Sequence, residues 1–154
     1  MWTKWLYGVP HKCPQVSLLG PQGAPGAVGW PLGKIAILCR NCTDNGPLYF
    51  YESMLTKHNI PHTLLETYQD MRNQARHDCV TLCTIHKSKG LEYDAVFVVG
   101  CTDDFFPSRN ATHDAGIEEE RRLFYVAVTR AKYYLYLTFS GQTQSMTMTR
   151  FISE

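Results

Sequence analysis

The fold is decided by a segment that reads CVTLCTIHKSKGLE at residues 79–92, AVFVVG at 95–100 and IEEERRLFYVAVTRAK at 117–132. The first run and AVFVV are rich in valine, threonine and isoleucine, which is typical of buried strands. The third run carries an apolar stripe at helical spacing, formed by Ile117, Phe124, Val128 (or Ala127) and Ala131. The segment predicts a strand, a charged loop, a second strand, a longer loop and a helix.

Apolar runs on either side of this segment predict the remaining elements. KIAILC at 34–39, HTLLE at 62–66 and YYLYLTF at 133–139 are predicted strands. Pro47 suits the first turn of a helix over 48–58, and Asn59 is its expected stop. Two weaker predictions are a short helix or loop at 67–77 and a terminal helix at 147–152. Strands separated by helices or long crossings predict an α/β domain with a mainly parallel sheet.

The first 33 residues differ from the rest of the chain. They hold most of the glycines and prolines and show no sustained period, so we expect an arm or linker that is poorly ordered. The domain itself is expected at 34–154. The stretch before Lys34 is not a phosphate-binding loop, because Val28 replaces its first glycine and Ile35 its hydroxyl residue.

The net charge of the chain is close to zero, with 15 Lys and Arg against 14 Asp and Glu among 154 residues. A site for nucleic acid must therefore be local, because no basic field covers the whole molecule. No apolar run approaches the roughly 18 residues that span a bilayer, and the N-terminus lacks the apolar core of a secretory signal. We expect an intracellular protein of the cytoplasm or nucleus, with no membrane partner.

The six cysteines are expected to be thiols, because an intracellular setting is reducing. Cys39 and Cys42 form a CxxC pair, and Cys79 and Cys83 lie four residues apart, so a zinc or redox site is one interpretation. Their positions inside or at the end of apolar runs favour small buried hydrophobic residues instead.

Loops that follow parallel strands should meet at one edge of the sheet, where ligands of such sheets bind. Three predicted loops follow strands: the turn that begins at Arg40, the loop at 86–92 and the loop that contains Asp103. The edge that they form is the expected site.

The loop at 86–92 has the chemistry of a phosphate site. Gly90 permits a positive φ or a close backbone approach, and Glu92 could accept a hydrogen bond from a ribose hydroxyl. The groups that could hold or attract a phosphate are Thr84, His86, Lys87, Ser88, Lys89 and the backbone amides. A solvated loop between strands explains the same residues, and their chemistry alone leaves both interpretations open.

Arg130 follows the apolar stripe near the end of the predicted helix. A cation there is ordinarily explained by the helix dipole, and spacing alone favours a surface arginine in a salt bridge. Earlier in the helix, Glu118 and Arg122 are expected to form an i,i+4 pair.

TIHKSKGLEYDAVFVVG (84–100) and EEERRLFYVAVTRAK (118–132) resemble motifs V and VI of the UvrD/Rep/PcrA family of superfamily 1 DNA helicases. KIAILCRN and YESMLTKHNIPH resemble the segment that opens the second RecA-like motor domain of that family. The resemblance covers about residues 34–140, with the motifs in order around an FFP loop at 105–107. It implies a RecA-like three-layer domain with a mainly parallel sheet.

The resemblance implies ATP hydrolysis that drives stepping along single-stranded DNA. ATP would lie between two RecA-like domains, with Mg²⁺ held by the first domain and an arginine finger supplied by the second. By motif position the finger is Arg130, and the positions nearest the nucleotide are Gly90 and Glu92. The positions that face DNA are occupied here by Arg40, Thr84 and His86.

Motif VI also implies that Glu120 and Arg121 brace the finger by ion pairing. The chain departs from the family pattern at Cys42, where the family usually has asparagine, and at Ser108, where it has a histidine near DNA. The large accessory subdomain that the family commonly inserts between residues 60 and 79 is absent.

The sequence contains no Walker A motif, no Walker B acid pair and no QNYRS-like motif IV. Half of the ATP site is therefore missing, and we expect the second motor domain of a DNA helicase, active in processes such as repair but unable to hydrolyse ATP alone. The alternative is a non-catalytic module that binds DNA or docks on a partner carrying the first domain. A thiol or zinc module is the third interpretation.

Overall fold

The computed structural model describes residues 31–41, 46–65, 78–103, 105–111, 113–138 and 149–152. The elements, in chain order, are η1 (Leu32–Lys34), β1 (Ile35–Cys39), α1 (Pro47–Lys57), β2 (His62–Leu64), β3 (Val80–Thr84), β4 (Tyr93–Val98), α3 (Asp114–Val128), β5 (Ala131–Leu137) and η2 (Arg150–Ile152). The predictions for residues 1–30, for 67–77 and for Cys42 lie outside these residues.

The strands form one five-stranded sheet in the order β2-β3-β1-β4-β5. Each neighbouring pair is parallel, with Leu38 of β1 opposite Cys83 of β3 and opposite Val98 of β4. Every residue of the central strand β1 is buried, which is the burial that a parallel sheet covered on both faces requires. The predicted α/β fold with a mainly parallel sheet is confirmed.

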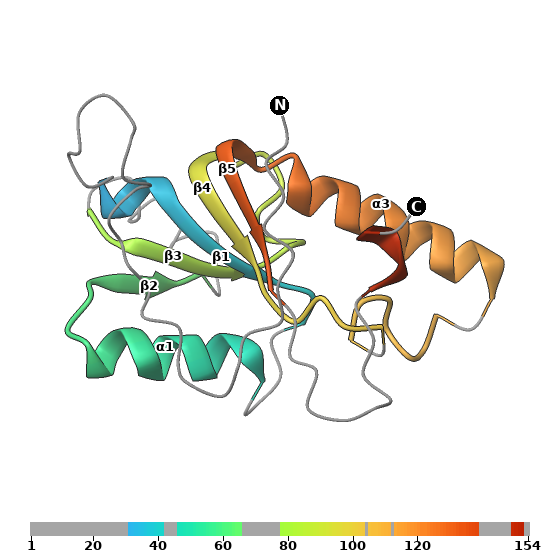
Figure 1. Ribbon diagram of the computed structural model, residues 1–154, viewed down its shortest axis with the longest axis horizontal. Helices are drawn as coiled ribbons and strands as arrows, with labels where there is room; N and C mark the ends of the chain where they lie inside the picture. The colour runs from blue at the N-terminus through green and yellow to red at the C-terminus, as the bar shows by residue number, and fades with distance from the viewer. Residues whose placement is uncertain are drawn as a thin grey trace.

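The sheet has a separate apolar core on each face. Leu48 and Leu55 of α1 pack with Ile35, Ile37 and Leu82 on one face. Figure 1 shows α1 along one side of the strands and α3 at the other. The three layers follow from the alternation of side chains along each strand.

The core on the opposite face is built around α3 and an aromatic cluster. Leu123, Phe124 and Ala127 of α3 are buried there together with residues of the central strands. The ring of Phe106, which is fully buried, lies 5.4 Å from that of Phe124 and 6.0 Å from that of Phe151. Phe151 thereby anchors η2 on the loop that follows β4.

An ion pair holds η2 to the same loop. Nε and Nη2 of Arg150 donate to Asp103 at 3.0 and 2.7 Å, and the Thr149 amide donates to the Cys101 carbonyl oxygen at 2.9 Å. The pKa of Asp103 is lowered, chiefly by the hydrogen bond from the Arg150 side chain. Of the terminal helix predicted at 147–152, the described residues form only this short 3₁₀ turn.

The helix predicted at 117–132 is shifted toward the N-terminus. It begins at Asp114 and ends at Val128, and β5 begins at Ala131 instead of residue 133. The Tyr93 amide donates to the Arg130 carbonyl oxygen at 2.9 Å, and Ala131 pairs with Tyr93. Sheet pairing with β4 therefore ends the helix, although the sequence pattern itself continues.

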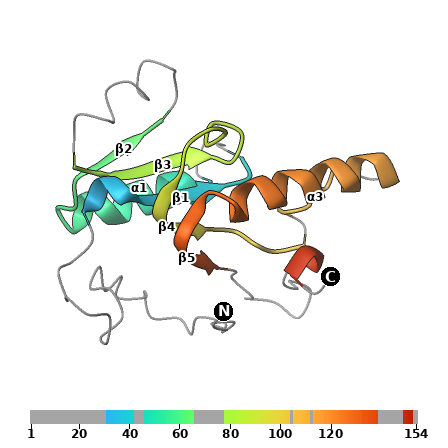
Figure 2. The same ribbon diagram turned by 90° about the horizontal axis from the view of Figure 1, so that it is seen from above.

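The N-terminal part of α3 projects beyond the ends of the strands, as Figure 2 shows from above. Asp114 and Ala115 are accordingly exposed, whereas the middle of the helix is buried against the sheet. Within the described part of the chain, no helix has the length and apolar character needed to cross a membrane.

The structure predicts that Thr149→Val raises the free energy of unfolding by about 1 kcal/mol. The hydroxyl of Thr149 is buried and has no hydrogen-bond partner among the residues that the structure describes, and an unpaired buried polar group costs about 1–3 kcal/mol. Valine keeps the shape of the side chain and removes this cost. Urea denaturation of the two chains measures the difference.

Thr81→Val is the matched control. Thr81 is equally buried, but it is not left without a partner, so its replacement should lower the free energy of unfolding by about 1 kcal/mol. A loss of stability in both variants would contradict the assignment of Thr149 as an unpaired group.

Candidate functional site

The loops that follow β1, β3 and β4 lie at the same edge of the sheet, as the parallel strands require. The Ile85 amide donates to the Cys39 carbonyl oxygen at 2.9 Å, and the Val99 amide donates to that of Leu38 at 2.8 Å. These bonds hold the start of each loop against β1. The prediction that the Arg40, His86 and Asp103 loops share one edge is confirmed.

The turn after β3 is shaped by its own hydroxyl groups. Ser88 is fully buried, and its hydroxyl donates to the Ile85 carbonyl oxygen at 2.7 Å. The Thr84 hydroxyl accepts from the Lys87 amide at 3.4 Å. The interpretation of Ser88 as a phosphate ligand is therefore wrong, because its hydroxyl faces the interior of the turn. The exposed residues of the turn are His86, Lys87, Lys89 and Gly90.

Gly90 has a φ of +82°, a region that residues with a side chain rarely adopt. A Cβ atom placed there would find no atom within 4 Å. Backbone conformation therefore requires glycine at this position, and the open space leaves the backbone accessible to a ligand. Glu92, two residues later, is exposed and pairs with Lys132 of β5 at 3.3 Å.

Arg130 lies just past the end of α3 and donates only to uncharged acceptors. Its Nε and Nη1 donate to the Val126 and Leu91 carbonyl oxygens, both at 3.1 Å, and its Nη2 donates to the Thr129 hydroxyl at 3.3 Å. Among the described residues, no carboxylate pairs with it. The expectation of a salt-bridged surface arginine is wrong.

The end of the loop after β3 and the end of α3 are therefore joined. The Arg130–Leu91 hydrogen bond and the Lys132–Glu92 ion pair connect them at adjacent positions. The structure thus brings together Gly90, Glu92 and Arg130, the residues that the motifs place nearest a nucleotide. These three residues present a half-buried guanidinium beside an exposed glycine and an exposed carboxylate.

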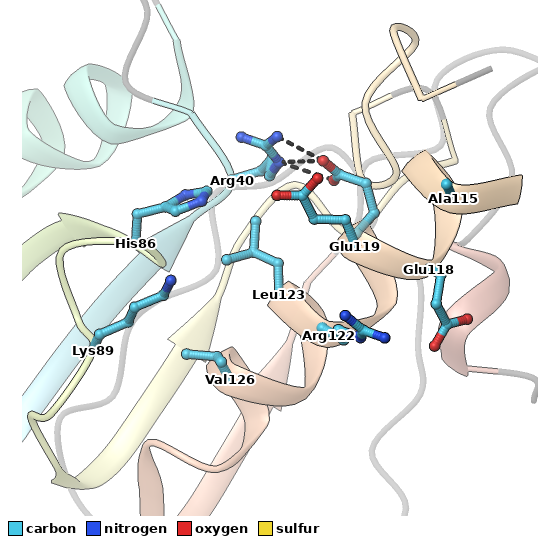
Figure 3. A pocket seen from close by; sticks show the side chains of 10 residues that line it. Arg40, His86, Lys89, Ala115, Glu118, Glu119, Arg122, Leu123 and Val126 are labelled. Atoms are coloured by element: carbon cyan, nitrogen blue, oxygen red, sulfur yellow. Dashed lines mark hydrogen bonds and ion pairs between the residues drawn. The ribbon is translucent and has the colours of Figure 1, made fainter. Parts of the chain in front are cut away.

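A groove of about 490 Å³ runs between α3 and the loops after β1 and β3. Figure 3 shows the side chains of Arg40, His86 and Lys89 on one wall and those of the helix on the other. The groove is lined by Arg40, His86, Lys89, Ala115, Glu118, Glu119, Glu120, Arg122, Leu123 and Val126. Both signs of charge therefore face the same hollow.

The ion pair between Arg40 and Glu120 closes one end of this groove. Nε of Arg40 donates to both carboxylate oxygens at 3.0 and 2.9 Å, and Nη2 donates to Oε1 at 2.6 Å. The hydrogen bond to Glu120 raises the pKa of Arg40. Glu120 therefore does not brace Arg130, and Arg121 pairs with Glu118 instead, so the expected bracing is wrong.

His86 lies on the same wall of the groove as Arg40 (Figure 3), with Thr84 half-buried two residues before it. Partial burial, followed by the positive charges of Arg40 and Lys89, lowers the pKa of His86. The imidazole is therefore neutral near pH 7. Arg40, Thr84 and His86, the predicted DNA-facing residues, lie at the same edge of the sheet, although contact with DNA stays a prediction.

Sequence reasoning missed the groove residues Lys89 and Arg122 as a group, and it gave Glu120 the wrong partner. A signal for Glu120 was available. It lies three residues after Ile117 and four before Phe124, so it interrupts an apolar stripe on the buried face of a helix. A carboxylate in such a place requires a cation from another element. Which cation provides it depends on the packing of α3 on β1.

The four cysteines in the described residues, Cys39, Cys79, Cys83 and Cys101, are buried free thiols. Burial raises the pKa values of Cys83 and Cys101 to about 12. Within the same residues, no group of three or more histidine, cysteine and acidic side chains is arranged to hold a metal ion. Cys42, the partner of Cys39 in the CxxC pair, lies outside them.

The parallel sheet, with its glycine-containing edge loop and its arginine at the end of α3, defines an α/β domain of the helicase C-terminal class. Residues 65–142, just over half of the 154-residue chain, match the family model of the UvrD-like helicase C-terminal domain. The chain belongs to this family.

Three relatives illustrate the match. The ATP-dependent DNA helicase Rep of Buchnera aphidicola subsp. Acyrthosiphon pisum (strain APS) is 39% identical over 98 residues, 60% of this chain and 15% of that protein. PcrA of Bacillus subtilis (strain 168) is 45% identical over 84 residues, 50% of this chain and 11% of PcrA. DNA helicase II of Escherichia coli (strain K12) is 44% identical over 82 residues, 53% of this chain and 11% of that helicase.

The chain thus spans only 11 to 15% of the length of these relatives. A solved structure, the C-terminal domain of a possible DNA helicase from Lactobacillus plantarum WCFS1, has the same fold. It matches with a TM-score of 0.53 and 22% identity, covering 78% of this chain and 61% of that one.

We predict that Gly90→Ala lowers the free energy of unfolding by about 1–2 kcal/mol, because alanine is strained at this positive φ. Gly90→Asn should lose less, since asparagine tolerates this region better. Lys89→Ala, at the exposed neighbouring position, is the control and should change stability by less than about 0.5 kcal/mol. Equal stability of the glycine and alanine forms in urea would contradict the assigned backbone conformation.

We also predict that Cys83 and Cys101 resist alkylation by iodoacetamide at pH 8 in the native chain. With pKa values of about 12, only about one thiol in ten thousand is ionised at that pH. Peptide mass spectrometry after labelling, with the urea-unfolded chain as the control, measures this. Labelling of Cys83 in the native chain as fast as in urea would contradict its burial.

Proposed function

We propose that this chain is the second motor domain of an ATP-dependent DNA helicase and that Arg130 is its arginine finger. The observation that carries the proposal is the bonding of Arg130, whose guanidinium has only uncharged acceptors and no carboxylate partner in the described residues. Its full charge is therefore available to a phosphate that enters from outside the domain.

The neighbouring residues fit the other parts of a nucleotide. Gly90 leaves open space beside the loop backbone, and Glu92 has an exposed carboxylate that could accept from a ribose hydroxyl. When bound, ATP supplies the phosphoryl group whose hydrolysis drives movement. Arg130 would donate to the oxygens of that group as negative charge develops on them.

The proposed enzyme needs a first RecA-like domain. The chain has no Walker A or Walker B motif, so the first domain would hold the phosphates and Mg²⁺, and this domain would complete the site. Two of the relatives described above, Rep and PcrA, are named as ATP-dependent DNA helicases, which supports a shared ATP site. An intracellular location follows, because that is where the DNA lies.

Single-stranded DNA is the proposed track. His86 and Thr84 lie at the end of β3, and the exposed Lys89 and Arg122 add positive charge to the adjoining groove. These groups would meet phosphates and sugars without reading bases. A module that binds DNA without any motor role is the alternative, and it would bind oligonucleotides but gain no ATPase from an added first domain.

In a two-domain enzyme, Arg130→Ala should lower the DNA-stimulated kcat by about 10³- to 10⁵-fold, the usual effect of losing such an arginine. Nucleotide binding should change little, because the first domain holds most of the phosphate contacts. The isolated chain should show no DNA-stimulated ATPase. Phosphate release at saturating ATP and oligonucleotide measures both.

Lys57→Ala removes a cation from the end of α1, on the opposite face of the sheet, and should leave turnover unchanged. Arg130→Lys keeps the charge but loses the paired N–H donors of the guanidinium, so its kcat should also be lowered. Activity that survives Arg130→Ala would refute the finger assignment, and turnover by the isolated chain would refute the need for a first domain.

A further inference from the structure

Arg40 is the first residue after the central strand of the sheet, and contacts within the chain engage all of its guanidinium nitrogens. Nε and Nη2 donate to Glu120, and Nη1 donates to Oδ1 of Asn41 at 2.6 Å. The fork geometry that would grip a phosphate is therefore already filled by a carboxylate. A phosphate could bind Arg40 only by displacing that carboxylate.

Displacement is costly because Glu120 is buried. The residue is 5% exposed, and its one other donor among the described residues is the Ser108 amide, 3.3 Å from Oε2. A buried carboxylate that loses its cation destabilises the fold by about 150- to 5,000-fold in the folding equilibrium. An exposed phosphate contact in water recovers little of that loss, so Glu120 keeps Arg40.

The pair connects three parts of the edge. Arg40 directly follows β1, Glu120 lies in the second turn of α3, and Ser108 lies in the loop between β4 and α3. Leu123, Phe124 and Ala127 hold the helix on the sheet, but apolar contacts alone fix its position along its axis poorly. A three-bond fork at one end fixes that position.

The opposite end of the same helix leads to Arg130, which lies two residues past Val128. Glu120 and Val128 are eight helical residues apart, roughly 12 Å along the helix axis. The Nε of Arg130 donates to the Val126 carbonyl oxygen in the last turn of α3, so a slip of the helix on the sheet would displace the guanidinium. Even 1 Å of displacement of a group that acts on a reacting centre can cost about 100-fold in rate.

We propose that Arg40 and Glu120 form a positioning clamp, which sets α3 and thereby Arg130 against the sheet, and that Arg40 does not bind DNA phosphate. Lys89 and Arg122 then provide the phosphate contacts of the groove, since neither has an ion-pair partner in the described residues. The link to Arg130 and the phosphate contacts rest on the proposed function, whereas the clamp itself does not.

A double-mutant cycle on the full chain tests the clamp without DNA. Arg40→Met, Glu120→Gln and the double variant are compared with the parent in urea, and the two substitutions should be coupled by at least 30-fold in the folding equilibrium, roughly the lower range for buried pairs. The matched control is the more exposed pair Arg150 and Asp103, which should couple by less than about fivefold. Coupling of Arg40 and Glu120 no larger than that of the control would overturn the clamp.

Arg40→Lys keeps the charge without the fork and serves where the methionine variant fails to fold. The Arg40 Nε–H resonance of the parent chain is assigned as the signal that is missing from the NMR spectrum of Arg40→Lys. This resonance should stay in place when an oligothymidine saturates the chain, because Glu120 keeps the guanidinium. A shift that follows oligonucleotide binding would overturn the proposal.

Salt dependence separates the clamp from a phosphate contact. The slope of log K against log salt is negative. Its magnitude should decrease by about 0.7 in Lys89→Gln and in Arg122→Gln, because each variant loses one contact with a single-strand phosphate. It should not change in Arg40→Lys or Arg40→Met. A fall of about 0.7 in Arg40→Met would overturn the assignment. If the parent chain bound no oligothymidine, the DNA part of the proposed function would fail, and the cycle in urea would still decide the clamp.

Discussion

Parallel pairing of β1 between β3 and β4 is the constraint on which the rest of this domain depends. Parallel strands place their carboxyl ends at one edge, so the residues after Cys39, Thr84 and Val98 have to meet there. The same pairing buries every residue of β1 and separates two apolar cores. Fold and site therefore have one physical origin, because the strands that exclude water also bring the loops together.

Helix α3 connects the two ends of the site. Its buried stripe packs on the sheet, Glu120 reaches the end of β1, and the residues past its C-terminus return to the sheet as β5. The helix ends two residues before Arg130, which leaves that side chain to bond with Leu91 of the neighbouring loop. A helix that ran through residue 132 would have carried Arg130 on its own surface.

The charges at the edge divide into two kinds. Arg40 and Glu120 neutralise each other in a partly buried pair, whereas Lys89, Arg122 and Arg130 keep positive charge without a carboxylate partner in the described residues. Paired charges hold elements in place, and unpaired ones attract anions. A helicase C-terminal domain with a net charge of only +1 can therefore present local cations to phosphate.

Much of this protein could be predicted from its sequence alone. Apolar runs predicted the strands, and the motifs around Gly90 and Arg130 identified the family, because both depend on residue type and spacing within short stretches. The end of α3, the burial of Ser88 and the partner of Glu120 could not be predicted in this way. The burial of Ser88 is set by the folding of its own turn. The other two are set by contacts between residues far apart in the sequence, such as Arg40 and Glu120, which are 80 positions apart. Only the packing of α3 across the sheet decided which arginine the buried carboxylate would hold.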